Sequence, residues 1–128
     1  MSATILIVDD ESHIRHLTAR MLAMAGYQVI EAASGPEALR LIEESKPDVI
    51  TCDIDMPGMD GFEVLKAIKS RPSTADTPVI MLTGIGQRKD AVQATELGAS
   101  DYMTKPFGST NLIETIERQL AARQEANE

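Results

Sequence analysis

The chain lacks tryptophan and contains only two Tyr, two Phe and one Cys among its 128 residues. A single cysteine excludes an internal disulfide and fits a reducing compartment. Because aromatic side chains are scarce, aliphatic residues and the seven Met must fill the core. A chain of this length is enough to bury a core of its own. We therefore predict one domain over residues 1–128, with a polar tail at 123–128 that frays.

Positive charge is also in short supply. The chain has 12 Lys and Arg against 20 Asp and Glu, which gives a net charge of −8. This balance argues against direct binding to nucleic acid, which requires clustered cations, and against binding to an anionic membrane surface. No apolar run has the length of a bilayer span, and the N-terminus lacks the features of a signal peptide. We expect a cytoplasmic protein without a membrane segment.

Four apolar runs in the chain each end in a polar residue that could do chemistry. Continuous apolar runs without alternation are typical of strands that are buried on both faces of a parallel sheet. A further strand is predicted over residues 27–32, which ends without a reactive side chain. The four runs and the residues that follow them are Ile5–Val8 with Asp9 and Asp10, Val49–Cys52 with Asp53, Val79–Leu82 with Thr83, and Asp101–Thr104 with Lys105.

Segments with helical spacing of apolar residues lie between these strands. Ser34 and Glu37 are spaced as in a capping box, with Pro36 in the first turn, so a helix is predicted to begin there. The segment 88–97 has a thin apolar face and is expected to be only weakly held. The other helices are predicted over residues 12–25, from about 62 to 70, and from 109 to about 120.

Five strands that alternate with five helices predict an α/β fold with right-handed crossovers. We predict a doubly wound, five-stranded parallel sheet of order 2-1-3-4-5, the flavodoxin-like arrangement. Ligands of such sheets bind at the carboxyl ends of the strands, near the switch point between strands 1 and 3. Asp9, Asp10 and Asp53 are expected at that point.

A cluster of these three aspartates is unfavourable unless a cation joins it, because like charges about 4 Å apart repel by roughly 4 kcal/mol at an effective dielectric constant near 20. Oxygen ligands with open water positions suit Mg²⁺. No zinc pattern is present, and His13 and His16 lack companion ligands, so we interpret both as surface or boundary residues.

Phosphoryl chemistry is compatible with this set of residues. A cation, the Thr83 hydroxyl and the Lys105 ammonium would supply charge neutralisation and oriented donors. Asp53 could then act as a carboxylate nucleophile and form an aspartyl phosphate. Its neighbour Cys52 lies within an apolar run, so we interpret that thiol as a small core residue.

The motifs at the strand ends, taken together, resemble those of two-component response regulator receiver domains, and are similar to the single-domain chemotaxis type. The resemblance extends from Ile5 to about Leu120. Its motifs are Leu6-Ile7-Val8-Asp9-Asp10, Asp53-x-Asp55-Met56-Pro57-Gly58-Met59-Asp60-Gly61, Met81-Leu82-Thr83-Gly84, and Gly98-Ala99 before Asp101-Tyr102-Met103-Thr104-Lys105-Pro106-Phe107.

The resemblance implies a role for each matching acidic residue. Asp53 matches the phosphoacceptor, and Asp10 matches the acid that binds Mg²⁺ directly. Asp9 matches the acid that acts mostly through water. The backbone carbonyl of Asp55 matches a third protein ligand, so that the implied metal set is Asp9, Asp10, Asp53 and Asp55.

The remaining matches concern phosphoryl binding and the switch. Thr83 and Lys105 match the residues that hold phosphoryl oxygens. Tyr102 matches an aromatic residue whose inward turn, coupled to Thr83, alters the surface of helix 4, strand 5 and helix 5. The bond from Lys105 to Pro106 matches one that is typically cis in the family, and Ile85 falls at a position that varies.

The resemblance implies a non-enzymatic signalling switch. Its phosphodonor would be a histidine kinase or a histidine phosphotransfer protein, and its output would be the binding of a downstream protein target. The resemblance also allows a homodimer that forms on phosphorylation. One alternative is a receiver-like interaction module that is not phosphorylated. The other is a phosphohydrolase of the haloacid dehalogenase type, because Asp53-x-Asp55 resembles its nucleophile and acid–base pair. That motif normally ends the first strand of its core, so the switch is the preferred hypothesis.

Overall fold

The computed structural model describes residues 2–84, 88–105 and 108–127. Within this part, five strands form one parallel sheet in the order β2-β1-β3-β4-β5, as predicted. The strands are β1 (Thr4–Val8), β2 (Gln28–Ala32), β3 (Val49–Asp53), β4 (Val79–Thr83) and β5 (Asp101–Thr104). The helices are α1 (Ser12–Met24), α2 (Gly35–Ser45), α3 (Gly61–Ser70), α4 (Arg88–Glu96) and α5 (Ser109–Asn127).

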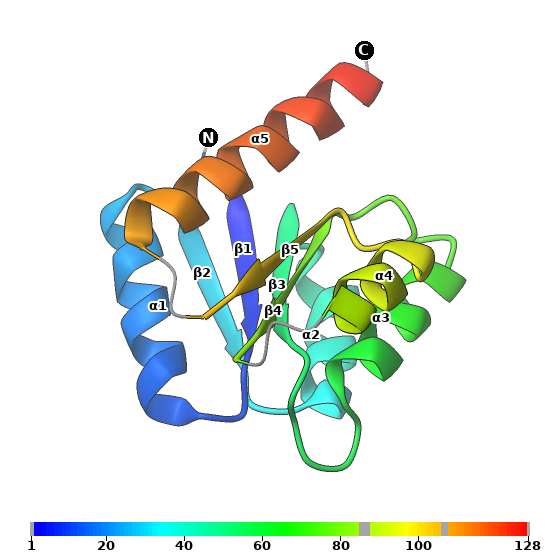
Figure 1. Ribbon diagram of the computed structural model, residues 1–128. Helices are drawn as coiled ribbons and strands as arrows, with labels where there is room; N and C mark the ends of the chain where they lie inside the picture. The colour runs from blue at the N-terminus through cyan, green and yellow to red at the C-terminus, as the bar shows by residue number, and fades with distance from the viewer. Residues whose placement is uncertain (1, 85–87, 106–107, 128) are drawn as a thin grey trace.

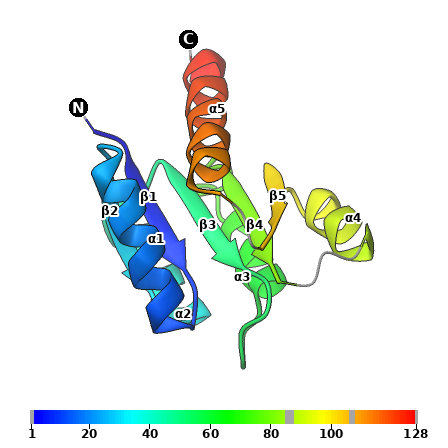
Figure 2. The same cartoon turned by 60° about the vertical axis from the view of Figure 1, so that its left-hand side comes forward.

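The helices cover both faces of the sheet (Figures 1 and 2). Helices α1 and α5 pack on one face, where Leu22 and Ile116 belong to the same buried cluster. Helices α2, α3 and α4 lie on the other face, where Ile42, Leu65 and Ala94 contribute to a second cluster. Strands β3 and β4 are buried along their whole length, as their unbroken apolar runs predict.

The helix starts differ in detail from the sequence prediction. Ser34 caps α2 by accepting the N–H of Glu37, but the Glu37 carboxylate accepts the N–H of Ala33, one residue before the cap, at 2.9 Å. The predicted capping box is therefore wrong in its second half. A complete capping box begins α3 instead, where Asp60 and Glu63 each accept the other's backbone N–H.

Two further helices bear on the predictions. In α4 only Ala94 is buried, and Val92 is 49% exposed, so the thin apolar face expected for this segment is confirmed. Helix α5 continues to Asn127, and the Arg123 guanidinium donates to the backbone oxygen of Asp48 at 2.8 Å. Fraying of residues 123–128 stays a prediction.

Gly61 lets the start of α3 approach the end of β3 closely. Its N–H donates to the backbone oxygen of Ile54 at 3.0 Å. A Cβ atom added at Gly61 would lie 2.7 Å from the Ile54 Cα and in contact with the backbone oxygen of Asp53. No side chain therefore fits here unless the backbone that carries Asp53 moves.

We predict that Gly61→Ala lowers the free energy of unfolding by about 1–3 kcal/mol, the usual range for overpacking. Gly84→Ala is the control, because a Cβ atom there meets no atom within 4 Å. Urea unfolding of both variants measures the difference. Equal stability of the two variants would contradict the role assigned to Gly61.

Candidate functional site

The register of the parallel strands brings the predicted residues to one edge of the sheet. Val8 pairs with Cys52, so the residues that follow them, Asp9 and Asp53, are neighbours. Thr83 pairs with Thr104, and the Lys105 N–H then donates to the backbone oxygen of Thr83 at 2.7 Å. The carboxyl ends of β1, β3, β4 and β5 thus meet at one site.

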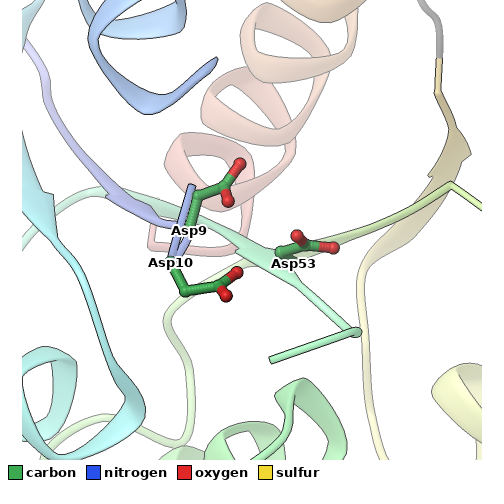
Figure 3. Close-up of side chains that lie close together, drawn as sticks. All are labelled: Asp9, Asp10 and Asp53. Carbon is green, nitrogen blue, oxygen red and sulfur yellow. The ribbon is translucent and has the colours of Figure 1, made fainter. Parts of the chain in front are cut away.

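Three carboxylates gather at this edge (Figure 3). Asp9, Asp10 and Asp53 each offer an oxygen, and these atoms all lie within 4.8 Å of one another. Asp9 and Asp10 follow β1, Asp53 ends β3, and the Asp10 side chain extends toward Asp53 in the figure. Asp9 and Asp53 are buried, whereas Asp10 is exposed at the opening of the site.

The Lys105 ammonium joins the two buried carboxylates. Its Nζ lies 3.3 Å from Oδ2 of Asp9 and 3.3 Å from Oδ2 of Asp53. The cluster holds three carboxylates and this ammonium contacts two of them, so about two negative charges of the cluster remain uncompensated when all four groups are ionised.

The excess of negative charge in the site affects the pKa values of Asp53 and Lys105. Burial raises the pKa of Asp53 above its usual value; the Asp9 charge adds to the rise, and Lys105 opposes it. Burial alone would lower the pKa of Lys105, but the Asp53 and Asp9 charges outweigh it and raise that pKa. Lys105 therefore stays charged at neutral pH, while Asp53 is held in a site that still favours added positive charge.

The polar atoms of Asp9 already have partners within the chain. Its N–H donates to the backbone oxygen of Ala32 at 3.1 Å, and its Oδ1 accepts the N–H of Glu11 at 2.9 Å. Its backbone oxygen accepts from Arg15 at 2.8 Å, and its Oδ2 faces Lys105. The exposed Asp10 carboxylate is therefore the more available of the two for a direct metal bond.

Asp55 contributes a contact that the sequence did not predict. Its Oδ2 accepts a hydrogen bond from the Thr83 hydroxyl at 3.1 Å, and its N–H donates to Oδ1 of Asp53 at 3.4 Å. In the sequence prediction Asp55 supplied a backbone carbonyl to the metal, or an acid–base carboxylate in the dehalogenase alternative, but no bond to Thr83. Asp55 thus brings a fourth carboxylate to the rim of the site.

The donor set fits a hard divalent cation. An open pocket at the site is lined by Asp10, Glu11, Asp53, Asp55, Gly84 and Lys105. The cluster offers carboxylate oxygens only, with residual negative charge and an open side that water can fill, which are the conditions that suit Mg²⁺.

Comparison with known proteins identifies the fold family. Residues 5–117 match the family described as response regulator receiver domain. The chain belongs to this family. Over 117 residues it is 43% identical to the phosphate regulon transcriptional regulatory protein PhoB of Pseudomonas aeruginosa, a match that covers 91% of this chain and 51% of that protein. It is also 43% identical to response regulator PleD of Caulobacter vibrioides, covering 91% of this chain and 26% of PleD.

Solved receiver structures are similar over the whole fold. The chemotaxis protein CheY4 of Vibrio cholerae superposes with a TM-score of 0.90 at 37% identity, covering 94% of this chain and 100% of that one. A CheY-like receiver domain from Methanospirillum hungatei gives a TM-score of 0.90 at 34% identity, covering 98% and 99%. The chain spans about half or less of the length of the curated relatives named above.

Family membership establishes the general function. This receiver domain is a signalling domain of the two-component type that works through phosphorylation, not a classical enzyme. Receiver domains bind Mg²⁺ at an acidic pocket, and the aspartate cluster is such a pocket here. None of the helices that the structure describes is both long enough and apolar enough to cross a bilayer.

Tyr102 lies in β5, the edge strand of the sheet, and pairs with Met81 of β4. Its hydroxyl oxygen is shielded from solvent and has no hydrogen-bond partner among the described residues. Burial raises the pKa of Tyr102, and the charges of Asp90 and Asp55 add to this effect. The Lys105–Pro106 bond and Ile85 lie outside the described residues.

Cys52 and the two histidines have the places expected of them. Cys52 is fully buried, and burial, followed by the Asp53 charge, raises its thiol pKa, so it is an inert core residue. His13 is exposed, and Nδ1 of His16 lies 2.7 Å from Oε1 of Glu31. Neither histidine belongs to the acidic cluster that the described residues form.

Sequence reasoning did not single out Arg15 or Glu31. They are 16 positions apart, and their contact depends on the pairing of β1 with β2. The helical position of Arg15 carried no signal that its side chain would turn back toward the strand ends.

We predict that Mg²⁺ raises the melting temperature of the wild-type domain more than that of Asp10→Ala, because the exposed Asp10 carboxylate supplies a ligand that alanine lacks. Thermal unfolding in EDTA and in excess Mg²⁺ gives the two shifts. Asp76→Ala, which removes an exposed carboxylate from a distant loop, serves as the control. Equal shifts in wild type and Asp10→Ala would contradict the proposed metal site.

Proposed function

We propose that this receiver domain takes a phosphoryl group from the phosphohistidine of a histidine kinase or a histidine phosphotransfer protein onto Asp53. The proposal rests on the surroundings of the buried Asp53 carboxylate. It lies 3.3 Å from the Lys105 ammonium, clusters with the carboxylates of Asp9 and Asp10, and lines an open pocket. A carboxylate in this position can attack an incoming phosphorus atom from the pocket side.

In the transfer step, an Asp53 carboxylate oxygen forms the new bond to phosphorus and the phosphorus–nitrogen bond to histidine breaks. The electron pair of that bond returns to the donor imidazole, and the product is an aspartyl phosphate. Bound Mg²⁺ would neutralise charge on the transferring phosphoryl oxygens. The Lys105 ammonium, now within 3.3 Å of Asp53, would turn to a phosphoryl oxygen.

The proposed roles of the other residues are based on their contacts around Asp53. Asp10 would bind Mg²⁺ directly, because its carboxylate is exposed, and Asp9 would act mostly through water, because its oxygens already have partners. The backbone carbonyl of Asp55 would complete the protein ligands. Thr83 would donate its hydroxyl hydrogen to a phosphoryl oxygen, for which it must leave the Asp55 carboxylate.

The output would be a change in the surface formed by α4, β5 and α5. Thr83 ends β4 next to β5, which carries Tyr102, and α4 is thinly anchored through Ala94. A shift of Thr83 toward the phosphoryl group would be coupled to Tyr102, so that a downstream protein target or a second copy of the domain recognises the altered surface. The net charge of −8 favours protein partners over nucleic acid for this domain.

The two alternatives receive less support. In a dehalogenase-type phosphohydrolase, Asp55 would serve as the acid–base residue, but its carboxylate is engaged by Thr83 and the motif ends the third strand. A module that is never phosphorylated would leave the joint placement of Asp10, Asp53, Thr83 and Lys105 without a purpose.

Acetyl phosphate with Mg²⁺ tests the acceptor directly. Intact-mass spectrometry is expected to show one phosphoryl adduct on the wild type and none on Asp53→Asn, because the amide cannot act as the nucleophile. The control Asp76→Asn should take the adduct as the wild type does. No adduct on the wild type, or an equal adduct on Asp53→Asn, would overturn Asp53 as the acceptor.

A further inference from the structure

Arg15 joins the acidic site to the end of β2, although it has no place in the phosphoryl chemistry. Its Nη1 donates to the backbone oxygen of Asp9 at 2.8 Å, and its Nε donates to Oε1 of Glu31 at 3.0 Å. The side chain is only 11% exposed. A guanidinium that makes two directed contacts in a mostly buried place is held in one orientation.

The Asp9 carbonyl that Arg15 holds belongs to the peptide unit between Asp9 and Asp10. A peptide unit is planar, so fixing its oxygen also fixes the direction of the bond to the next Cα. That next Cα carries the Asp10 side chain, which extends toward Asp53 (Figure 3). The Arg15 contact therefore sets the orientation of Asp10 relative to Asp53.

The rest of the Asp9 backbone and side chain is held independently of Arg15. The N–H of Asp9 is bound to Ala32, and its carboxylate to the Glu11 N–H and to Lys105. Loss of Arg15 would thus leave Asp9 in place while freeing the peptide unit that leads to Asp10. Asp10 itself is exposed and has little packing to hold it.

We propose that Arg15 is a positioning residue for the metal site, and that Glu31 acts through Arg15. This inference rests on the proposed use of Asp9 and Asp10 as magnesium ligands. Partners of this kind, which orient a ligand without touching the metal, typically change metal affinity by 10–100-fold when they are removed.

Electrostatics alone predicts the opposite result, which makes the test decisive. Arg15 is a cation beside a cation-binding site, so removing its charge would strengthen Mg²⁺ binding if the charge were all that mattered. A positioning role requires that removal of Arg15 weakens Mg²⁺ binding instead. The sign of the change therefore separates the two roles.

Calorimetric titration with Mg²⁺ of the unphosphorylated protein measures this sign. We expect Mg²⁺ affinity to fall about 10-fold or more in Arg15→Leu. The fall should be smaller in Arg15→Lys, whose single ammonium cannot make both contacts of the guanidinium. Arg20→Leu removes an exposed arginine from the same helix and should bind Mg²⁺ as the wild type does. Unchanged or stronger binding in Arg15→Leu would overturn the proposal.

The role of Glu31 is tested by a double-mutant cycle. If Glu31 acts through Arg15, Glu31→Ala weakens Mg²⁺ binding in the wild-type background and adds no further loss in Arg15→Leu. Additive losses would remove Glu31 from the proposal. Should Arg15→Leu fail to fold, Arg15→Lys and Glu31→Ala carry the test on their own.

A metal-free readout checks the mechanism. In amide NMR spectra recorded with EDTA, Arg15→Leu is expected to shift the signals of Asp10 and Glu11 and to leave those of the distant loop that carries Asp76 unchanged. Unmoved Asp10 and Glu11 signals would overturn the positioning role. A wild-type domain that does not bind Mg²⁺ would overturn the metal site of the proposed function as well, whereas normal wild-type binding with unaltered variants would overturn only the role of Arg15.

Discussion

Repulsion among the crowded carboxylates is the constraint on which the rest of the site depends. Each pair within 4.8 Å repels by roughly 3 kcal/mol or more at an effective dielectric constant near 20. The Lys105 ammonium relieves part of this repulsion by lying 3.3 Å from both buried members. In the proposed function, the remaining negative charge would attract a divalent cation, and the bound cation would in turn attract a phosphoryl group. Binding and chemistry therefore share one electrostatic origin.

The fold maintains this crowding through backbone contacts rather than through the acids themselves. Parallel pairing aligns the ends of β1 and β3, and Glu11, the N-cap residue of α1, donates its N–H to the Asp9 carboxylate. Gly61 lets α3 begin directly against the peptide that follows Asp53. Of the three clustered aspartates only Asp10 is exposed, so the one best placed to bind a metal directly is also the one least constrained by packing.

The ends of β1, β3 and β4 could be predicted from sequence because apolar runs mark buried parallel strands, and each of these runs stops at its polar residue. The predicted sheet order alone places Asp9, Asp10 and Asp53 at one point. Side-chain contacts across elements could not be predicted in this way. The Arg15–Glu31 and Thr83–Asp55 bonds depend on strand register and on side-chain rotamers. The Glu37 rotamer likewise decides that its carboxylate accepts the N–H of Ala33 and not that of Ser34.

A carbon-13 NMR titration of the Asp53 carboxyl in metal-free protein tests the central role of Lys105 most directly. The wild-type pKa is expected above the usual value for aspartate, because burial and the Asp9 charge outweigh the ammonium. Lys105→Met keeps the length of the side chain but removes its charge, so the Asp53 pKa should rise further. An Asp53 pKa that is unchanged or lower in Lys105→Met would contradict this account.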